Sequence, residues 1–174
     1  MHILLLEPCV DDYREVYAKR FKPEVHFWAD DELEIPSLEL YLSRRSKRLE
    51  NPHCIERIIL CDGQRIGTVS AFGINPLSRD CSLGIVIVDQ AYWGRGIGTV
   101  VLRAFLELLR NRGIRFVYLE TFADNLRAQR AFERVGFVPG SRFIHEECGR
   151  EVLTMNLRLF PKGASIEKPQ PKEE

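Results

Sequence analysis

The chain has 174 residues, of which 45% are apolar and 29% are charged, an ordinary balance for one soluble globular domain with a buried core. Its 25 basic and 25 acidic residues cancel, so we expect neither a nucleic-acid partner nor a membrane partner. The 5 cysteines form no C-x-x-C pair, and no signal peptide or membrane-length apolar run is present, so the sequence predicts a cytoplasmic protein with free thiols and no metal site.

The first half of the chain predicts one strand, two helices and a β-hairpin. In chain order, we expect a strand at 3–6, a helix opened by Asp11 or Asp12, a loop from Lys22 through the acidic run 30–34, and a helix from Pro36 to about Leu49. Two strands at 54–61 and 65–74 follow, and the Asp62-Gly63 dipeptide between them is a strong hairpin signal.

The second half predicts alternating strands and helices. A strand at 82–88 leads into a turn with three glycines, and a helix then runs to Gly113. A strand at 114–121, a helix behind Asn125, and strands at 137–145 and 151–159 complete a mixed α+β domain over residues 1–160. The polar, proline-rich tail 161–174 is expected to be disordered.

The turn from Tyr92 to Thr99 is the most informative feature. A glycine-rich turn that opens a helix leaves backbone N–H groups free at the positive end of the helix dipole, which suits a phosphate. Glycine at 94, 96 and 98 removes the β-carbons that would hold a phosphate away. The spacing excludes a P-loop, which needs Lys-Ser/Thr after the last glycine, and does not fit the G-x-G-x-x-G of dinucleotide-binding folds.

This turn resembles the acetyl-CoA loop of the GNAT superfamily of N-acetyltransferases, whose pattern is Gln/Arg-x-x-Gly-x-Gly/Ala. Gly96 and Gly98 fill the glycine positions, whereas Trp93 stands where the pattern has Gln or Arg. The family's second pattern, Asn-x-x-Ala-x-x-x-Tyr-x-x-x-Gly-Phe, is matched in register at Asn125, Ala128, Gly136 and Phe137. The resemblance covers residues 54–157 well and the preceding part loosely. The alternative is a turn whose glycines serve tight packing only, which the second motif disfavours.

The resemblance implies a GNAT-like α+β fold, with a twisted, mostly antiparallel sheet of about six to seven strands flanked by about four helices. It also implies an acetyl-CoA-dependent N-acetyltransferase that transfers an acetyl group directly to a primary amine. The branch it is most similar to acetylates ribosomal-protein N-termini and polyamines, so we expect a protein N-terminal α-amine or a small amine as acceptor. Acetyl-CoA is the expected co-substrate, and a homodimer is left open.

The resemblance also assigns roles to particular residues. Glu120 is the candidate general base for the amine proton, and Asn125 would bind pantetheine or an ordered water while capping its helix. Glu120 could instead be an exposed edge residue or part of a structural ion pair, and Asp89 and His145 are weaker candidates for the base. The predicted cofactor-binding residues are Val86, Ile87, Val88, Gly94, Arg95, Gly96, Ile97, Gly98, Thr99, Asn125 and Phe132.

Two details concern the thioester. A backbone N–H near Val88 is expected to polarise the thioester carbonyl, as an oxyanion-type donor does. Phe132 replaces the tyrosine that would protonate the leaving thiolate, and Tyr118 is a weak substitute. A CoA thiol is acidic enough to leave without a dedicated proton donor. A rival interpretation is a catalytically weak acyl-CoA-binding module, in which Trp93 and Phe132 mark lost chemistry.

Three further features are charged or aromatic. Arg127 and Arg130 either meet CoA phosphates or are solvated, and the basic run 43–48 is expected to be a solvated helix face. A nucleic-acid-binding protein that uses this run is poorly supported, because no stacking motif accompanies it. Phe27 and Trp28, with the acidic run behind them, suggest a rim for a cationic amine.

Overall fold

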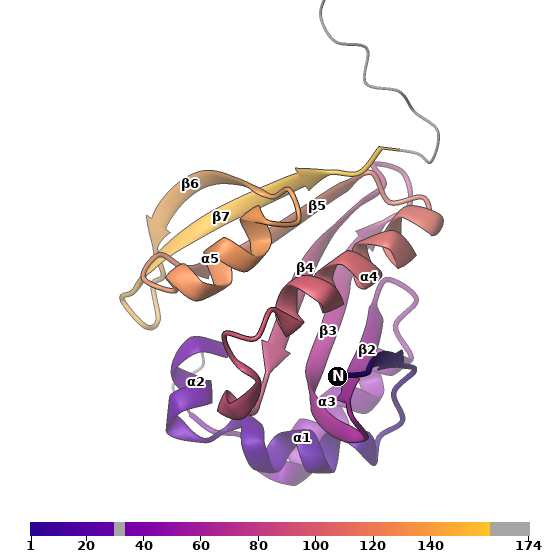
Figure 1. The fold of residues 1–174 in the computed structure, drawn as a ribbon, viewed down its shortest axis with the longest axis vertical. Coiled ribbons are helices and arrows are strands. Elements are labelled where there is room, and N and C mark those ends of the chain that lie inside the picture. The colour runs from indigo at the N-terminus through magenta and orange to yellow at the C-terminus, as the bar shows by residue number, and fades with distance from the viewer. Residues whose placement is uncertain (30–33, 161–174) are drawn as a thin grey trace, which may run out of the picture.

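The computed structural model describes residues 1–29 and 34–160, in which one sheet of seven strands forms the centre (Figure 1). Its strands are β1 (Ile3–Leu6), β2 (Ile55–Cys61), β3 (Gln64–Asn75), β4 (Asp80–Ile87), β5 (Phe116–Phe122), β6 (Val138–Ile144) and β7 (Glu151–Arg158). They lie in the order β1-β2-β3-β4-β5-β7-β6, and every neighbouring pair is antiparallel except β4 and β5. This confirms the predicted α+β fold with a mostly antiparallel sheet. The tail 161–174 and residues 30–33 of the acidic run lie outside the described residues.

Helices cover both faces of the sheet. Those in the described part of the chain are α1 (Asp12–Arg20), α2 (Pro23–Ala29), α3 (Leu38–Leu49), α4 (Ile97–Asn111) and α5 (Leu126–Glu133), with a short 3-10 turn, η1 (Gln90–Tyr92). The predicted loop from Lys22 is wrong over α2. Pro23 suits a first helical turn, where no N–H is needed, and Val25 is 2% exposed in the core.

Local sequence signals explain several boundaries. Asp62 and Gly63 adopt left-handed backbone angles, φ 46° and 83°, as a tight turn between β2 and β3 requires. The Ser37 hydroxyl accepts a hydrogen bond from the amide of Leu40 and caps α3. Before α1 the carboxylate of Asp12, and not that of Asp11, accepts a backbone hydrogen bond, from the amide of Cys9 at 2.8 Å.

The alternation of side chains along β4 divides the interior into two cores. Leu83, Ile85 and Ile87 pack on the core that includes α4 and α5. Val86 and Val88 point to the opposite face and pack with residues of α1, α2 and α3. Odd-numbered and even-numbered side chains of β4 therefore lie on opposite faces of the sheet.

The sheet divides between β4 and β5. These parallel strands pair only from Asp80–Phe116 to Ser82–Tyr118. Beyond that point β4 pairs with β3 alone and β5 with β7 alone, and Figure 1 shows the two halves diverging. The fold thus leaves a stretch of backbone on β4 without a strand partner on one side.

Residues 1–29 and 34–160 include no helix that is long and apolar enough to cross a membrane. In the same residues, no cluster of three or more His, Cys, Asp or Glu side chains is arranged to hold a metal ion.

Candidate functional site

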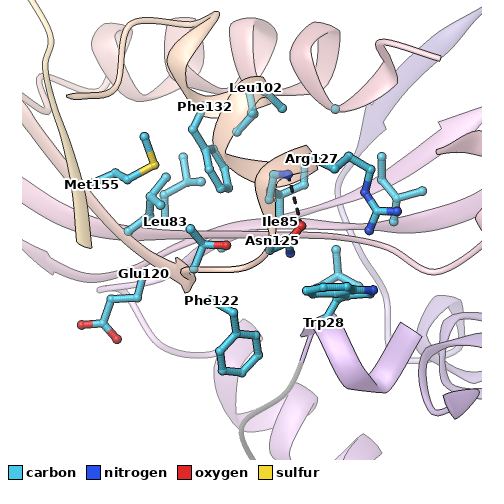
Figure 2. A pocket seen from close by; sticks show the side chains of 18 of the residues that line it. Trp28, Leu83, Ile85, Leu102, Glu120, Phe122, Asn125, Arg127, Phe132 and Met155 are labelled. Carbon is cyan, nitrogen blue, oxygen red and sulfur yellow. Dashed lines mark hydrogen bonds between the residues drawn. The ribbon is translucent and has the colours of Figure 1, made fainter. Parts of the chain in front are cut away.

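A cavity of about 1090 Å³ lies where β4 and β5 separate (Figure 2). Its wall includes the glycine turn and the start of α4 on one face of the sheet. It also includes Arg20 of α1 and Arg45 and Arg48 of α3 on the other face. The cavity therefore passes through the divided sheet, and residues from both faces of the sheet line it.

The glycine turn has the geometry of an anion site. Gly94 and Gly96 have left-handed φ angles of 72° and 78°, which explains glycine at both positions. Gly96 is the residue before α4, and the first amides of that helix have no acceptor within it. Gly96, Gly98 and Thr99 all line the cavity, whereas Arg95 is exposed and does not.

The residues of β4 that face the gap differ in part from those that the sequence predicted. The Val88 amide donates to the Ile66 carbonyl at 2.8 Å, so the oxyanion donor predicted at Val88 is already used by β3, and Val88 does not line the cavity. Because alternate residues of an antiparallel strand bond to the same neighbour, the amides of Ile85 and Ile87 point away from β3 into the gap. Ile85, which sequence reasoning missed, lines the cavity together with Val86 and Ile87.

Trp93 and Arg127 meet at the edge of the gap. The indole N–H of Trp93 donates to the Ile87 carbonyl at 2.8 Å, which fixes the ring beneath the end of β4. The guanidinium of Arg127, at the start of α5, lies 3.7 Å from the centre of the Trp93 ring. Partial burial lowers the pKa of Arg127. Arg127 therefore brings a cation to the position where the family pattern has Gln or Arg, whereas Arg130 is exposed outside the cavity wall.

Asn125 and Phe132 lie together on the α5 side of the cavity, as Figure 2 shows. The Asn125 side chain is 7% exposed and accepts a hydrogen bond from the Ala128 amide at 3.2 Å. This bond confirms its capping role. Phe132 is 6% exposed and packs edge-on against Phe137, with 5.8 Å between ring centres. The phenylalanine ring thus gives this wall an apolar surface where a tyrosine would present a hydroxyl.

Glu120 is the acidic side chain in the described wall of the cavity. It stands on β5 opposite Thr154 of β7, exposed to solvent, and lies across the cavity from Arg127 (Figure 2). Asp89 is instead engaged in structure, with Lys19 Nζ at 3.3 Å and the Ala91 amide at 3.1 Å. His145 and Tyr118 also line the cavity. The arrangement therefore places one carboxylate in the described wall of the cavity.

Arg150 joins α2 to the far half of the sheet, a contact that sequence reasoning missed. Its guanidinium donates to the Phe27 carbonyl and to Asp124 Oδ1, the latter at 3.1 Å. It also lies 3.5 Å from the ring centre of Phe122 and 5.4 Å from that of Trp28. The aromatic rim predicted for a cationic amine therefore already holds a cation of the protein itself. Nothing in the sequence signals a contact across more than a hundred residues.

A polar cluster fills the α3 side of the cavity. The prediction that the run 43–48 is solvated holds for Arg44 and Lys47 but is wrong for Arg45 and Arg48, which line the cavity. Both pair with Glu56 of β2, whose side chain is 1% exposed, at 3.1 Å from Arg45 and 3.4 Å from Arg48. Helical periodicity explains the split, because positions three apart share a face.

Two buried tyrosines, Tyr13 and Tyr41, complete that cluster. Burial, followed by the charge of Glu56, raises the pKa of Tyr13. Burial also raises the pKa of Tyr41, although Arg45 beside it acts in the opposite direction. Both side chains are therefore neutral phenols at physiological pH and contribute no negative charge to the cavity.

Comparison with known proteins agrees with this architecture. A model of the acetyltransferase (GNAT) family matches residues 11–137. N-alpha-acetyltransferase 30 of Schizosaccharomyces pombe is 36% identical over 55 residues, and the chain spans only 37% of that protein's length. A Bacillus subtilis N-acetyltransferase named for a ribosomal-protein alanine is 27% identical over 109 residues, which cover 62% of this chain and 70% of that one. The structure of spermidine N-acetyltransferase from Vibrio cholerae with CoA and spermine superposes with a TM-score of 0.81 over 90% of this chain and 95% of that one, at 17% identity, and so shares the fold.

Proposed function

The chain belongs to the acetyltransferase (GNAT) family, and from that membership we propose that it transfers the acetyl group of acetyl-CoA directly to a primary amine. The observation that carries this proposal is the separation of β4 from β5 with a glycine turn at the edge of the gap. Relatives are named for a protein N-terminal α-amine and for spermidine, so the acceptor class we propose is an N-terminal α-amine or a small amine.

The residues around the gap fit acetyl-CoA. The first amides of α4 and the glycines at 94 and 96 would hold the pyrophosphate, because an anion is stabilised at a helix N-terminus and no β-carbon projects from either glycine. The Arg127 guanidinium adds a positive charge nearby. The gap-facing amides of Ile85 and Ile87 would pair with pantetheine as an added strand would, whereas the Ile87 carbonyl is already bound by Trp93.

The chemistry needs one proton acceptor. When bound, acetyl-CoA supplies the acetyl carbon to which the amine nitrogen bonds, and the C–S bond breaks with its electron pair kept by sulfur. Glu120 takes the proton that the amine nitrogen loses, directly or through one water. An amide of the β4 edge, that of Ile87 or Ile85, takes the donor role predicted for Val88.

Phe132 supplies no proton to the sulfur. A thiol of ordinary acidity, with a pKa of about 8.5, leaves as a thiolate without a dedicated acid, so the proton on Glu120 can pass to the thiolate or to solvent. The apolar ring of Phe132 instead excludes water from the α5 side of the gap.

The proposal is tested by turnover on an amine panel. We would incubate the protein with acetyl-CoA and alanine-, serine- and methionine-starting peptides, spermidine, and small amino acids, and follow both free thiol and the mass of the N-acetyl product. Glu120→Gln should lower kcat by about 100-fold or more without changing the acetyl-CoA KM. The control Glu133→Gln, on an exposed residue of α5 outside the cavity wall, should act like the parent. Binding of acetyl-CoA without product on any amine would instead support the acyl-CoA-binding module.

A further inference from the structure

Gly84 of β4 is a glycine that the fold itself does not require. Seven of the described glycines have positive φ angles, and Gly84 is not among them. A β-carbon on Gly67 or Gly140 would come within 1.9 Å or 2.6 Å of a neighbouring atom. One built on Gly84 would lie 3.6 Å from its nearest neighbours, which is an ordinary contact. Neither backbone conformation nor packing therefore explains why this residue has no side chain.

Glycine at position 84 makes the strand less stable than alanine would. A glycine inside a strand loses more conformational freedom on folding and offers no side chain to pack. Alanine would fit and would place a methyl group against Phe72 and Ser70. A strand glycine without a structural explanation often marks a place where a ligand comes close to the backbone. Gly84 lines the cavity, so that ligand is one bound in the gap.

The face of the sheet at Gly84 indicates which ligand this is. Leu83 packs on the core that includes α4 and α5, so a β-carbon on Gly84 would project to the opposite face. Glu120 projects to that same opposite face, because its neighbour Leu119 belongs to the α4 and α5 core. Figure 2 shows Glu120 on the far side of the strands from Phe132. The free space at Gly84 therefore lies on the face of the candidate base.

The register of the sheet also brings Gly84 opposite Glu120. The parallel pairing of β4 with β5 ends at Ser82 and Tyr118. Two residues further along the two strands are Gly84 and Glu120, which therefore lie level with each other across the gap. The next amide of β4, that of Ile85, is one of the two proposed to bind the thioester. An amine that lies between this thioester and the Glu120 carboxylate therefore passes over Gly84.

We propose that Gly84 is a specificity-determining residue, whose missing side chain leaves the space that the acceptor occupies when its amine reaches the thioester. This inference rests on the proposed acetyl transfer and concerns the acceptor side of the same site. Phe72 and Ser70 border the space on β3, and Tyr118 borders it on β5. A side chain at position 84 takes room from the carbon atoms next to the acceptor amine, and it leaves the gap-facing amides of β4 unchanged.

Gly84→Ala should make the protein more stable and less active. Its Tm should rise by about 1–4 °C, because alanine restricts the unfolded chain and fits the folded one. For the best amine of the panel, kcat/KM should fall at least about 10-fold, because the added methyl group displaces the amine from its position of attack. The stabilisation by acetyl-CoA should equal that of the parent. The control Ser78→Thr adds one methyl group on the exposed turn before β4, outside the cavity wall, and should change none of these quantities.

Pairs of amines test whether space is what Gly84 provides. A glycine-starting and an alanine-starting peptide differ by one methyl group on the carbon that bears the amine, and ethanolamine and 2-amino-1-propanol differ in the same way. In the pair that the parent uses, Gly84→Ala should lower kcat/KM for the methylated member by at least about 3-fold more than for the other, because two methyl groups then compete for one space.

Four results would overturn the inference while leaving acetyl transfer intact. They are a fall in Tm, which would assign Gly84 to the fold; a weaker stabilisation by acetyl-CoA, which would assign it to the cofactor; an unchanged kcat/KM; and an equal loss for both members of the pair. No product from the parent on any amine, although acetyl-CoA binds, would instead refute the proposed function and this inference with it.

Discussion

Substitution of Gly96 separates the cost of a strained backbone from the cost of a lost ligand contact. Gly96 has a φ of 78°, and a β-carbon built on it meets nothing within 4 Å, so Gly96→Ala is penalised by conformation and not by packing. The left-handed conformation costs a residue with a β-carbon about 1–2 kcal/mol. For a chain of this size that lowers Tm by about 2–8 °C.

Gly113 provides a matched control at the other end of α4. It has a φ of 84°, it also has open space around a built β-carbon, and it is not part of the cavity wall. Gly113→Ala should therefore lose the same stability as Gly96→Ala. Gly98→Ala is a second control, because Gly98 has an ordinary helical φ and its β-carbon would rest 3.9 Å from Ile87 Cδ1, a normal contact. The family pattern also accepts alanine there.

Gly96→Ala should differ from Gly113→Ala in how much acetyl-CoA stabilises the protein. At 100 times the dissociation constant the ligand should stabilise the parent by about 2.7 kcal/mol. Loss of a charge-assisted contact of about 1.5–3 kcal/mol in Gly96→Ala weakens binding about 10- to 150-fold. At the same ligand concentration the stabilisation then falls to about 0.3–1.4 kcal/mol. Differential scanning fluorimetry with and without acetyl-CoA measures both quantities. An unchanged ligand shift in Gly96→Ala, or an equal reduction in Gly113→Ala, would refute the placement of the pyrophosphate at this turn.

Three further substitutions test individual contacts. Trp93→Phe removes the indole N–H that donates to a β4 carbonyl and should cost about 0.5–1.5 kcal/mol in urea unfolding, with no loss if that bond is absent. Burial would raise the pKa of Asp12, but hydrogen bonds from Cys9 and Arg65 outweigh this effect and hold the pKa below 3.8. The contribution of Asp12 to the stability of the fold is therefore complete above pH 3.8, and it is lost as the pH falls through the lower pKa of the folded protein. Asp12→Asn should therefore lose about 1–3 kcal/mol at pH 7 and much less near pH 2, and a loss independent of pH contradicts this. Arg150→Ala should speed hydrogen exchange in α2 at least about 10-fold while acetyl-CoA still binds, and unchanged exchange would show that other contacts hold α2.

The sequence predicted the elements whose signals are local. The Asp62-Gly63 turn needs positive φ angles, Ser37 and Asn125 cap their helices through their own side chains, and the glycine turn is a contiguous motif. Each of these features is determined within a few residues, so spacing alone reveals it. The resemblance implied a mostly antiparallel sheet, but the strand order was not predicted, because pairing between distant strands leaves no local mark.

The wrong predictions concern features that depend on tertiary contacts. Helix α2 has only 7 residues, too short to be stable alone, and is held by Arg150 from the far end of the chain. The burial of Arg45 and Arg48 depends on Glu56, a partner on another strand. The choice between Val88 and Ile85 as a gap-facing amide depends on the register of β3 against β4, and one residue of register reverses it.

Hydrogen exchange of the β4 edge tests the central claim most directly. The amides of residues 84–88 and 94–99 should exchange more slowly when acetyl-CoA is added, and ATP or NAD at the same concentration should have no effect. Protection confined to these segments would support a cofactor bound between β4 and β5. No protection of β4 with acetyl-CoA, or the same protection with ATP, would contradict it.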